Sequence, residues 1–406
     1  MMKGFIIIAL FFVAPAMHAQ GNAPLDLSGV WTTQSSDGFT ARAALTACVV
    51  EGKIYVMGGY NGVDFLNTLE VYDPTTDAWN TPTTTGTFTP RRGASSCYIN
   101  GKIYVMGGYN QTGTLNILEA FDPVKKEWST PVTTGTFTPR WRTSASEVDG
   151  KIYVIGGYNL TSGAVNTLEV FDPVKNEWST PVTTGSLMAR TDHASVVIGG
   201  KIYVVGGDGD NGFVPMQIFD PSTKTWSTPT TTGNFTLRKG LAALVFGDKI
   251  YTMGGFAGTL FLNTLEVFDP VSNVWSTPST TGTFSKRAGI GAGLVGSKIY
   301  CMGGNDPNGY TKANEAYTPT LSGVPIDHSL KEISAFPNPT SGIITIKEIP
   351  NNSSLSIENI LGQKVISIPH LVESNLSLDL SHFPSGIYFM KIKNGSSSLS
   401  HKIILQ

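Results

Sequence analysis

Six apolar runs, each ending in a pair of glycines, are spaced almost evenly along the chain. They read KIYVMGG twice, then KIYVIGG, KIYVVGG, KIYTMGG and KIYCMGG. The glycine pairs recur at intervals of 49, 49, 50, 48 and 49 residues, beginning at Gly58, Gly107, Gly156, Gly206, Gly254 and Gly303. Hydrophobic residues on both phases of a strand-length run are typical of a strand covered on both faces. The pattern therefore predicts six similar β-rich units that pack against one another.

A second strand-length run follows each glycine pair. It reads LEVYDP in the first unit and LEAFDP, LEVFDP, MQIFDP, LEVFDP and NEAYTP in the others. In every unit but the last, a Trp and a Thr/Pro/Gly-rich linker come next, with the tryptophans at Trp79, Trp128, Trp178, Trp226 and Trp275. Four short strands in a unit of about 50 residues are typical of a propeller blade.

These motifs, recurring at matched offsets, resemble the kelch repeat family over residues 31 to about 319. The resemblance implies an all-β fold, a six-bladed kelch-type β-propeller. The last unit lacks its Trp, but Trp31 precedes the first glycine pair by 27 residues, whereas the other tryptophans precede the next pair by 28. We therefore expect residues 28–320 to form a propeller closed by an N-terminal strand, which supplies the outer strand of the last blade and covers its edge.

The pattern changes after residue 320. Period-two runs separated by Gly, Pro and Asn predict a small antiparallel β-sandwich over residues 332–406, behind a linker of residues 321–331. This module resembles the C-terminal sorting domain of proteins exported by the type IX secretion system of Bacteroidetes. The resemblance implies that the secretion machinery is a partner, and it implies a sorting role for Pro337, Asn338, Pro339, Gly362, Gly386 and Tyr388. An ordinary adhesive sandwich is the alternative.

The first 19 residues have the layout of a secretory signal peptide, with Lys3, an apolar stretch and small residues at Ala16 and Ala19. Cleavage after Ala19 or Ala16 is expected, and an uncleaved anchor is the alternative. The apolar stretch is too short to span a bilayer, so we expect no transmembrane segment in the mature chain. The whole chain carries 14% charged residues and a net charge of −2, which provides no global field to recruit nucleic acid. A secreted or cell-surface protein is expected.

One arginine per unit lies 16 residues before the glycine pair, where the chain enters the innermost strand: Arg42, Arg91, Arg140, Arg190, Arg238 and Arg287. A ring of guanidinium groups could bind a carboxylate or sulfate through forked hydrogen bonds. Alternatively, each arginine pairs within its blade with the repeated acid of the second run (Glu70, Glu119, Glu169, Glu266, Glu315). Gln217 interrupts the acid series, so Arg190 is expected to be freer to meet a ligand.

Positions that differ between units are better candidates for a specialised site. Trp141, the one Trp outside the series, stands between Arg140 and Arg142. Arg92 and Lys239 add positive charge at the same place in other units, directly after the repeat arginine. Simple packing of a linker is the alternative for Trp141. Asp192-His193 could form an acid/base pair, and the Asp208–Gly212 loop offers oxygen ligands for calcium, but a structural role is expected for both.

Three cysteines remain, Cys48, Cys97 and Cys301, and an odd number cannot all pair within one chain. We expect buried thiols, with a Cys48–Cys97 bridge as the alternative. No cysteine has a second Cys or a His at metal-ligand spacing, and no phosphate, dinucleotide or nucleophile motif is found. We therefore expect neither a metal nor a cofactor.

Together these features predict a non-catalytic binding protein for an extracellular glycan or protein. The candidate ligand-binding residues are Arg91, Arg92, Arg140, Trp141, Arg142, Arg190, Arg238 and Lys239. A carbohydrate-active enzyme is the alternative, because some kelch propellers are enzymes and a channel lined by Arg and Glu would resemble that of a sialic acid mutarotase or epimerase.

Overall fold

The computed structural model describes residues 26–322, 334–338, 340–347, 349, 351, 353–359, 364–371, 373–394 and 397–405. The predicted signal peptide, most of the predicted linker, Pro339 and Gly362 lie outside these residues. The described residues form strands, turns and loops and contain no helix, as expected for an all-β protein. Two compact units divide the chain, one spanning Leu27–Thr320 and the other including the residues from Leu321 onward.

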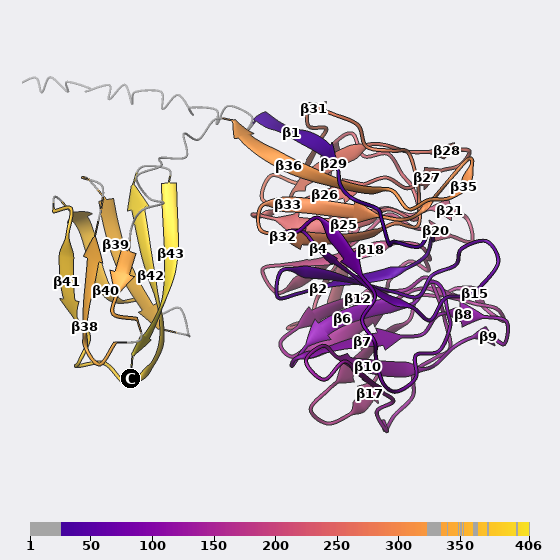
Figure 1. Cartoon of the computed structure of the whole chain (residues 1–406), viewed down its shortest axis with the longest axis horizontal. Helices are drawn as coiled ribbons and strands as arrows, with labels where there is room; N and C mark the ends of the chain where they lie inside the picture. Colours follow the sequence, from indigo (N-terminus) through magenta and orange to yellow (C-terminus); the bar gives the residue numbers. More distant parts are fainter. Residues whose placement is uncertain are drawn as a thin grey trace, which may run out of the picture. The chain divides into compact units, whose positions relative to one another are not determined.

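The Leu27–Thr320 unit contains six sheets of four or five strands (Figure 1). The first strands are β2 (Thr46–Val50), β6 (Ser95–Ile99), β12 (Ser144–Val148), β18 (Ala194–Ile198), β25 (Ala242–Phe246) and β32 (Gly291–Val295). The second strands, which carry the KIYVM-type runs, are β3 (Lys53–Met57), β7 (Lys102–Met106), β13 (Lys151–Ile155), β19 (Lys201–Val205), β26 (Lys249–Met253) and β33 (Lys298–Met302).

The outer half of each sheet holds the second apolar run and the Trp. The third strands are β4 (Leu69–Asp73), β10 (Leu118–Asp122), β16 (Leu168–Asp172), β22 (Gln217–Asp220), β29 (Leu265–Asp269) and β36 (Asn314–Ser322). The fourth strands are β5 (Ala78–Asn80), β11 (Glu127–Ser129), β17 (Glu177–Ser179), β23 (Thr225–Ser227), β30 (Val274–Ser276) and, in the last sheet, β1 (Asp26–Thr33). Two short strands extend the last two sheets, β24 (Thr232–Gly233) and β31 (Thr280–Thr281).

The sheets pack face to face through both sides of their second strands. In β3, Ile54, Val56 and Met57 are fully buried. Met57 shares an apolar cluster with Ile103 and Val105 of the next sheet, whereas Ile54 and Val56 cluster with Tyr300 of the last sheet. Burial on both faces explains why these runs are apolar at every position rather than alternating.

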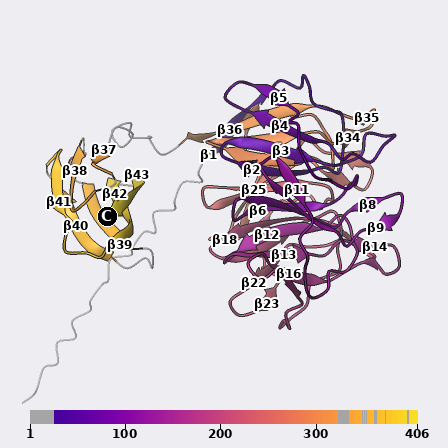
Figure 2. The same ribbon diagram turned by 60° about the horizontal axis from the view of Figure 1, so that its bottom comes forward.

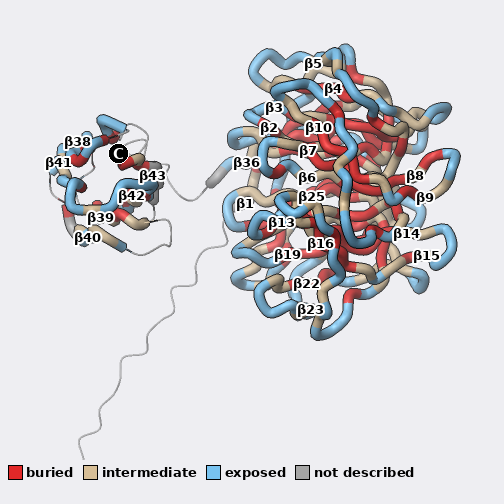
Figure 3. Tube along the Cα trace, turned by 90° about the horizontal axis from the view of Figure 1, so that it is seen from below, coloured by how far each residue is buried: buried red, intermediate tan, exposed pale blue. Residues whose placement is uncertain are grey.

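The first strands of the six sheets lie next to one another. They make contacts in the order β2, β6, β12, β18, β25, β32, and β32 in turn contacts β2. Figure 2 shows β2, β6, β12 and β18 inside the unit, with β5 and β23 at its periphery. The tube in Figure 3 shows the buried residues concentrated in the interior and the exposed ones on the peripheral turns. Residues from the first strands of all six sheets line a shared cavity.

The N-terminal strand β1 completes the last sheet, between β36 and β31. Trp31 stacks on Phe284 at 4.4 Å and lies 5.1 Å from the ring of Tyr317. The second sheet has the same arrangement, with Trp128 at 4.4 Å from Phe88 and 5.0 Å from Phe121. Although Trp31 lies 286 residues before Tyr317 in the sequence, it has the same kind of ring neighbours as the repeat tryptophan Trp128.

Short hairpins connect the second and third strands and gather at one side of the unit (Figures 1 and 2). They are β8 (Tyr109–Asn110) with β9 (Gly113–Thr114), β14 (Tyr158–Asn159) with β15 (Gly163–Ala164), β20 (Asp208–Gly209) with β21 (Gly212–Phe213), β27 (Phe256–Ala257) with β28 (Leu260–Phe261), and β34 (Asn305–Asp306) with β35 (Gly309–Tyr310). In the first sheet, a single bridge between Tyr60 and Phe65 takes the place of the hairpin.

The C-terminal unit consists of two antiparallel sheets that share one apolar core. One sheet has the order β37 (Ser334–Phe336), β38 (Ile343–Lys347), β41 (Leu376–Asp379). The other has the order β40 (Lys364–Leu371), β39 (Ser353–Asn359), β42 (Gly386–Asn394), β43 (Ser397–Leu405). The shared core joins Ile344 and Ile346 to Ile357, Met390 and Ile392. This core contains no residue of the first unit.

Candidate functional site

The six repeat arginines are fully buried. Arg42 contacts Glu70 at 2.6 Å and Arg91 contacts Glu119 at 2.7 Å. The same pair forms in three further sheets, joining Arg140 to Glu169, Arg238 to Glu266 and Arg287 to Glu315. Burial lowers the pKa of Arg91 to about 10, and the neighbouring Glu119 opposes that shift. Charges this deep in the protein need a paired partner to be tolerated.

Each glutamate also accepts hydrogen bonds from the chain segment that carries its arginine. Glu119 accepts hydrogen bonds from the amide and the hydroxyl of Thr89, at 3.1 and 2.7 Å. The Arg91 guanidinium lies 4.7 Å from the ring centre of Phe88. This geometry favours the structural interpretation of the series, in which the arginine fastens the linker onto its own sheet.

Arg190 is not freer than the others. Its guanidinium donates to the side chain of Gln217 at 2.6 Å and to the backbone carbonyls of Met188, Gly206 and Pro215. Gln217 therefore substitutes for the glutamate as an acceptor. The candidates Arg91, Arg140, Arg190 and Arg238 all lie with their side chains buried inside the sheets, away from the exposed part of the window.

A circle of backbone hydrogen bonds joins the six linkers immediately after these arginines. The bonds run Gly93 to Ala44 (2.7 Å), Arg142 to Gly93 (2.6 Å), Asp192 to Arg142 (3.1 Å), Gly240 to Asp192 (2.8 Å), Gly289 to Gly240 (2.8 Å) and Ala44 to Gly289 (2.9 Å), amide to carbonyl in each case. All six residues have a positive φ between 52° and 64°. Glycine or alanine fills four of these ring positions, and the charged residues Arg142 and Asp192 fill the other two.

Two cavities meet at this ring. The inner one, of about 230 Å³, is lined by the first strands of all six sheets. The outer one, of about 400 Å³, is lined by side chains of the linkers and hairpins, among them Tyr60, Arg92, Trp141, Arg142, Asp192, Lys239, Phe256, Phe261 and Tyr310. Both touch Arg142 and Asp192. We call the outer cavity the mouth.

The mouth brings together four of the predicted candidates: Arg92, Trp141, Arg142 and Lys239. Trp141 is 7% exposed and packs 5.0 Å from Tyr109 and 6.5 Å from Tyr158, so most of its ring serves packing. The Arg92 guanidinium lies within 5.6 Å of four ring centres, those of Tyr60, Phe65, Tyr109 and Trp141. Such cation–π contacts hold the Arg92 guanidinium in place at the cavity wall.

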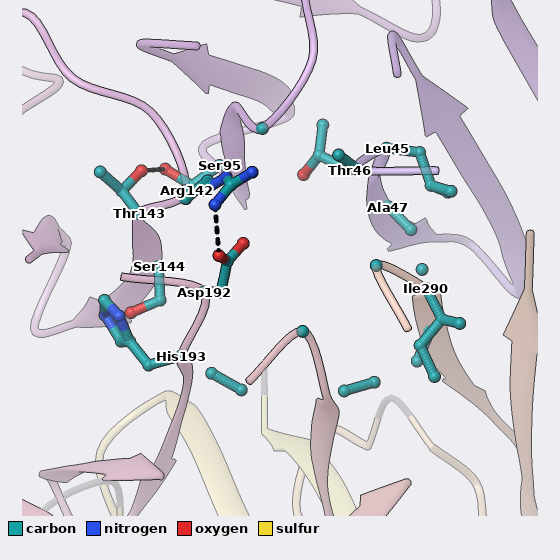
Figure 4. Close-up of a pocket in the computed structure, with 18 of the residues that line it drawn as sticks. Leu45, Thr46, Ala47, Ser95, Arg142, Thr143, Ser144, Asp192, His193 and Ile290 are labelled. Atoms are coloured by element: carbon teal, nitrogen blue, oxygen red, sulfur yellow. Dashed lines mark hydrogen bonds and ion pairs between the residues drawn. The ribbon is translucent and has the colours of Figure 1, made fainter. Parts of the chain in front are cut away.

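The other two cations of the mouth are paired with carboxylates. Arg142 donates to Asp192 at 2.9 Å, and Figure 4 shows the two side chains pointing toward one another. Lys239 donates to Asp208 at 2.6 Å. Burial raises the pKa of Asp192, while the charges of Arg142 and Lys239 act against that shift.

The predicted acid/base pair does not form, because His193 points away from solvent. His193 is 6% exposed, and neither of its ring nitrogens has a hydrogen-bond partner. Burial, together with the nearby Arg190, lowers its pKa to about 3. In the predicted calcium loop, Asp208 holds Lys239, and Asp210 accepts from the amide of Ala164 at 3.3 Å. Among the described residues, no group of three or more His, Cys, Asp or Glu is placed to hold a metal ion.

The three cysteines are free thiols in the structure. Cys48 and Cys301 are buried, and Cys97 is half-buried. Burial raises the pKa of Cys48 to about 11 and that of Cys301 to about 12. A thiol that resists ionisation is a poor nucleophile, so these side chains act as small core residues.

Sequence reasoning singled out Asp192 only as a possible partner of His193, and it did not select the aromatic mouth residues Tyr60, Tyr310, Phe256 and Phe261. Tyr60 and Phe256 directly follow a glycine pair, at a position that is Tyr in three units and Asp, Phe or Asn in the others. This variation after a constant motif was a signal in the sequence. The sequence alone does not show that this position lines the mouth, because that depends on how the chain folds after the glycine pair.

In the C-terminal unit, three of the predicted sorting residues are tied to the sheets or lie within them. Asn338 accepts a hydrogen bond from the amide of Ile404 at 2.9 Å, which joins the start of the unit to its last strand. Tyr388 is buried and donates to the carbonyl of Pro384 at 2.8 Å. Gly386 begins β42, where it pairs with Leu405, and Pro337 directly follows β37.

The motifs and the sheets define an exported kelch-repeat protein. The family model described as the KLHDC2/KLHL20/DRC7 Kelch-repeats domain matches residues 25–157 and 142–320, and the chain belongs to this kelch-repeat family. The model of the secretion system C-terminal sorting domain matches residues 334–406. No curated protein matches the chain. Both predicted resemblances are confirmed, and the type IX machinery therefore exports the protein to the cell surface or the extracellular space.

Within the described residues, no helix is long and apolar enough to cross a membrane.

Proposed function

We propose that this protein is a secreted, non-catalytic binding protein. In this proposal, residues 28–320 form a six-bladed propeller closed by β1, and residues 332–406 form a sandwich that the secretion machinery recognises. The signal peptide of residues 1–19 and the linker of residues 321–331 belong to the same proposal. The circle of backbone hydrogen bonds and the matched surroundings of Trp31 and Trp128 support the closed ring.

The ligand is an acidic glycan or an acidic peptide that binds in the mouth. One observation carries this assignment: Arg92, Arg142 and Lys239, from three different linkers, line one cavity together with aromatic side chains. A local cluster of cations attracts an anion even though the whole chain is close to neutral. Aromatic rings contribute large contact areas at little cost in conformational entropy.

Binding without catalysis fits the state of the titratable groups. His193 lines the inner cavity, and its lowered pKa keeps it neutral. The carboxylate of Asp192 is engaged by Arg142 at 2.9 Å. The buried Arg–Glu pairs, which would line the channel of a sugar-acid epimerase, are used to fasten the sheets.

A screen of acidic glycans and acidic peptides against the purified protein tests the proposal. Binding should weaken as salt is added, because exposed charges are screened. Trp141→Ala should reduce both the stability of the protein and the affinity for the ligand found, because the buried ring packs on Tyr109 and holds the guanidinium groups of Arg92 and Arg142 at the mouth. Faster anomeric exchange of a free sugar acid in the presence of the protein, followed by NMR, would instead favour the epimerase. Salt-independent binding would contradict the assignment to the mouth.

A further inference from the structure

Two neighbouring ring positions carry charged side chains where the other positions carry Gly or Ala. Arg142 has a φ of 58° and Asp192 a φ of 55°. A residue with a side chain pays about 1 kcal/mol to adopt this left-handed conformation, which glycine adopts freely. Retained backbone strain of this kind is typical of functional positions. Ala44 has a similar φ of 52°, and Ala44, Gly240 and Gly289 also touch both cavities. Arg142 and Asp192 are set apart because their charged side chains face one another at 2.9 Å.

Arg142 and Asp192 place opposite charges side by side at the mouth. Arg142 stacks one face of its guanidinium on Trp141, at 3.9 Å from the ring centre, and offers its N–H donors to the mouth. Any anion placed on Arg142 also meets the negative charge of Asp192. Of the other charges at the mouth, Lys239 is held by Asp208 at 2.6 Å and Arg92 is held by four aromatic rings. A simple carboxylate is therefore repelled in part, whereas one that also carries hydroxyl donors can satisfy Asp192. Built-in repulsion is a general means of specificity.

We propose, resting on the function proposed above, that Arg142 and Asp192 select a cyclic, hydroxylated carboxylate such as a uronic acid. Arg142 binds its carboxylate, and Asp192 accepts hydrogen bonds from its neighbouring hydroxyl groups. The aromatic side chains of Tyr60 and Tyr310, whose ring centres are 5.5 Å apart, offer a surface for the apolar face of the sugar ring. The cavity of about 400 Å³ suits one or two such rings.

Titration calorimetry of the full protein with three probes at neutral pH tests this inference. The probes are glucuronate, cyclohexanecarboxylate, which lacks hydroxyl groups, and glucose, which lacks the carboxylate. The informative variants are Asp192→Asn, which removes the charge but suits a positive φ, and Arg142→Gly, which introduces the residue found at neighbouring ring positions. Lys125→Ala, in an exposed turn whose lysine side chain is 70% exposed, is the matched control for loss of a charge.

Asp192→Asn should lower the ratio of glucuronate to cyclohexanecarboxylate affinity by about tenfold or more, because charge-assisted bonds to hydroxyl groups are lost. Using the ratio cancels the repulsion that both anions feel. Arg142→Gly should weaken both acids and leave glucose unaffected, and the Lys125→Ala control should change none of the three. Thermal melts of all variants should remain at the wild-type value within a few degrees.

If Asp192→Asn binds both acids with an unchanged ratio of glucuronate to cyclohexanecarboxylate affinity, the inference that Asp192 selects the ligand is wrong. The proposed anion site at the mouth is then still supported. Binding of a polyglutamate peptide but of neither small acid also overturns only the selective pair. If neither the sugar acid nor the acidic peptide binds, both this inference and the proposed function fail.

Discussion

At the scale of single residues, the arginines of this chain fall into two classes that the sequence alone does not separate. Arg140 and Arg142 stand two positions apart, yet Arg140 is fully buried against Glu169, while the side chain of Arg142 is 34% exposed at the mouth. The difference follows from the local path of the chain, which turns at Arg142 through a positive φ. One arginine therefore serves the fold and the other faces the cavity.

Replacing Arg140 by Ala should destabilise the protein by about 3–5 kcal/mol, because Glu169 is left buried without its partner. Arg142→Gly is the matched control and should change the stability by about 1 kcal/mol or less, since its ion pair with Asp192 is only half-buried and glycine suits the local φ. Urea unfolding of both variants measures the difference. Equal losses for both would contradict the division into two classes.

His193 should make the protein sensitive to acid. Its pKa of about 3 in the folded state lies below the ordinary value of 6.5, because burial excludes the charged form. The unfolded chain therefore takes up a proton first, and stability falls as the pH drops from about 6.5 toward 3, by on the order of 3 kcal/mol at pH 4.

His193→Leu should flatten this part of the stability curve, because Leu45 and Leu241 occupy the same position in other units and cannot titrate. Unfolding measured between pH 7 and pH 4 tests the prediction. A pH dependence identical in both proteins would show that other groups cause the acid sensitivity.

At the scale of elements, β1 comes from the start of the repeats but lies in the sheet of the last repeat. It lies between β36 and β31, and Trp31 is 4% exposed. A short strand from the start of the chain thereby covers the edge that the incomplete last unit would otherwise expose. β1 stabilises the first unit through the burial of Trp31 and through its backbone hydrogen bonds to the neighbouring strands.

Deleting residues 20–34 should cost at least about 3–5 kcal/mol, the usual loss for removing a buried tryptophan. Deleting residues 20–25 alone, which precede β1, should have little effect. The comparison is made by thermal unfolding of the two truncated proteins. If they melt at the same temperature, β1 does not complete the last sheet in solution.

At the scale of the whole molecule, the two units have separate cores. The apolar cluster of the C-terminal unit contains only residues from Ala335 to Leu405, whereas the clusters between the sheets of the first unit run from Trp31 to Tyr317. Separate cores imply that each unit can fold without the other. The sorting domain that directs export then has a core of its own.

Removing residues 328–406 should leave a folded first unit that stays inside the cell envelope, because the sorting domain is lost. The truncated protein should keep the thermal transition and the ligand binding of that unit. Cell fractionation followed by circular dichroism of the recovered protein measures both. A truncated form found in the medium in the same proportion as the full chain would contradict the role of the tail.

The sequence was sufficient for the family, the all-β fold, the assignment of strands to units and the sorting tail. The repeats make this possible, because a weak signal at one position becomes strong when it recurs six times at a fixed interval. The sequence predicted three buried thiols; Cys48 and Cys301 are buried, whereas Cys97 is half-buried. These properties depend on local pattern and on counting.

Only the tertiary structure decided which polar residues face a cavity. Sequence reasoning grouped Arg91, Arg140, Arg190 and Arg238 with Arg92, Arg142 and Lys239, because all lie in the same window of each unit. Burial separates them: the first group is sealed between strands, and the second lines the mouth. The pairing of Arg142 with Asp192, 50 residues apart, arises because neighbouring sheets bring successive linkers together at the ring. Such contacts depend on the positions of whole sheets, which no local pattern of residues encodes.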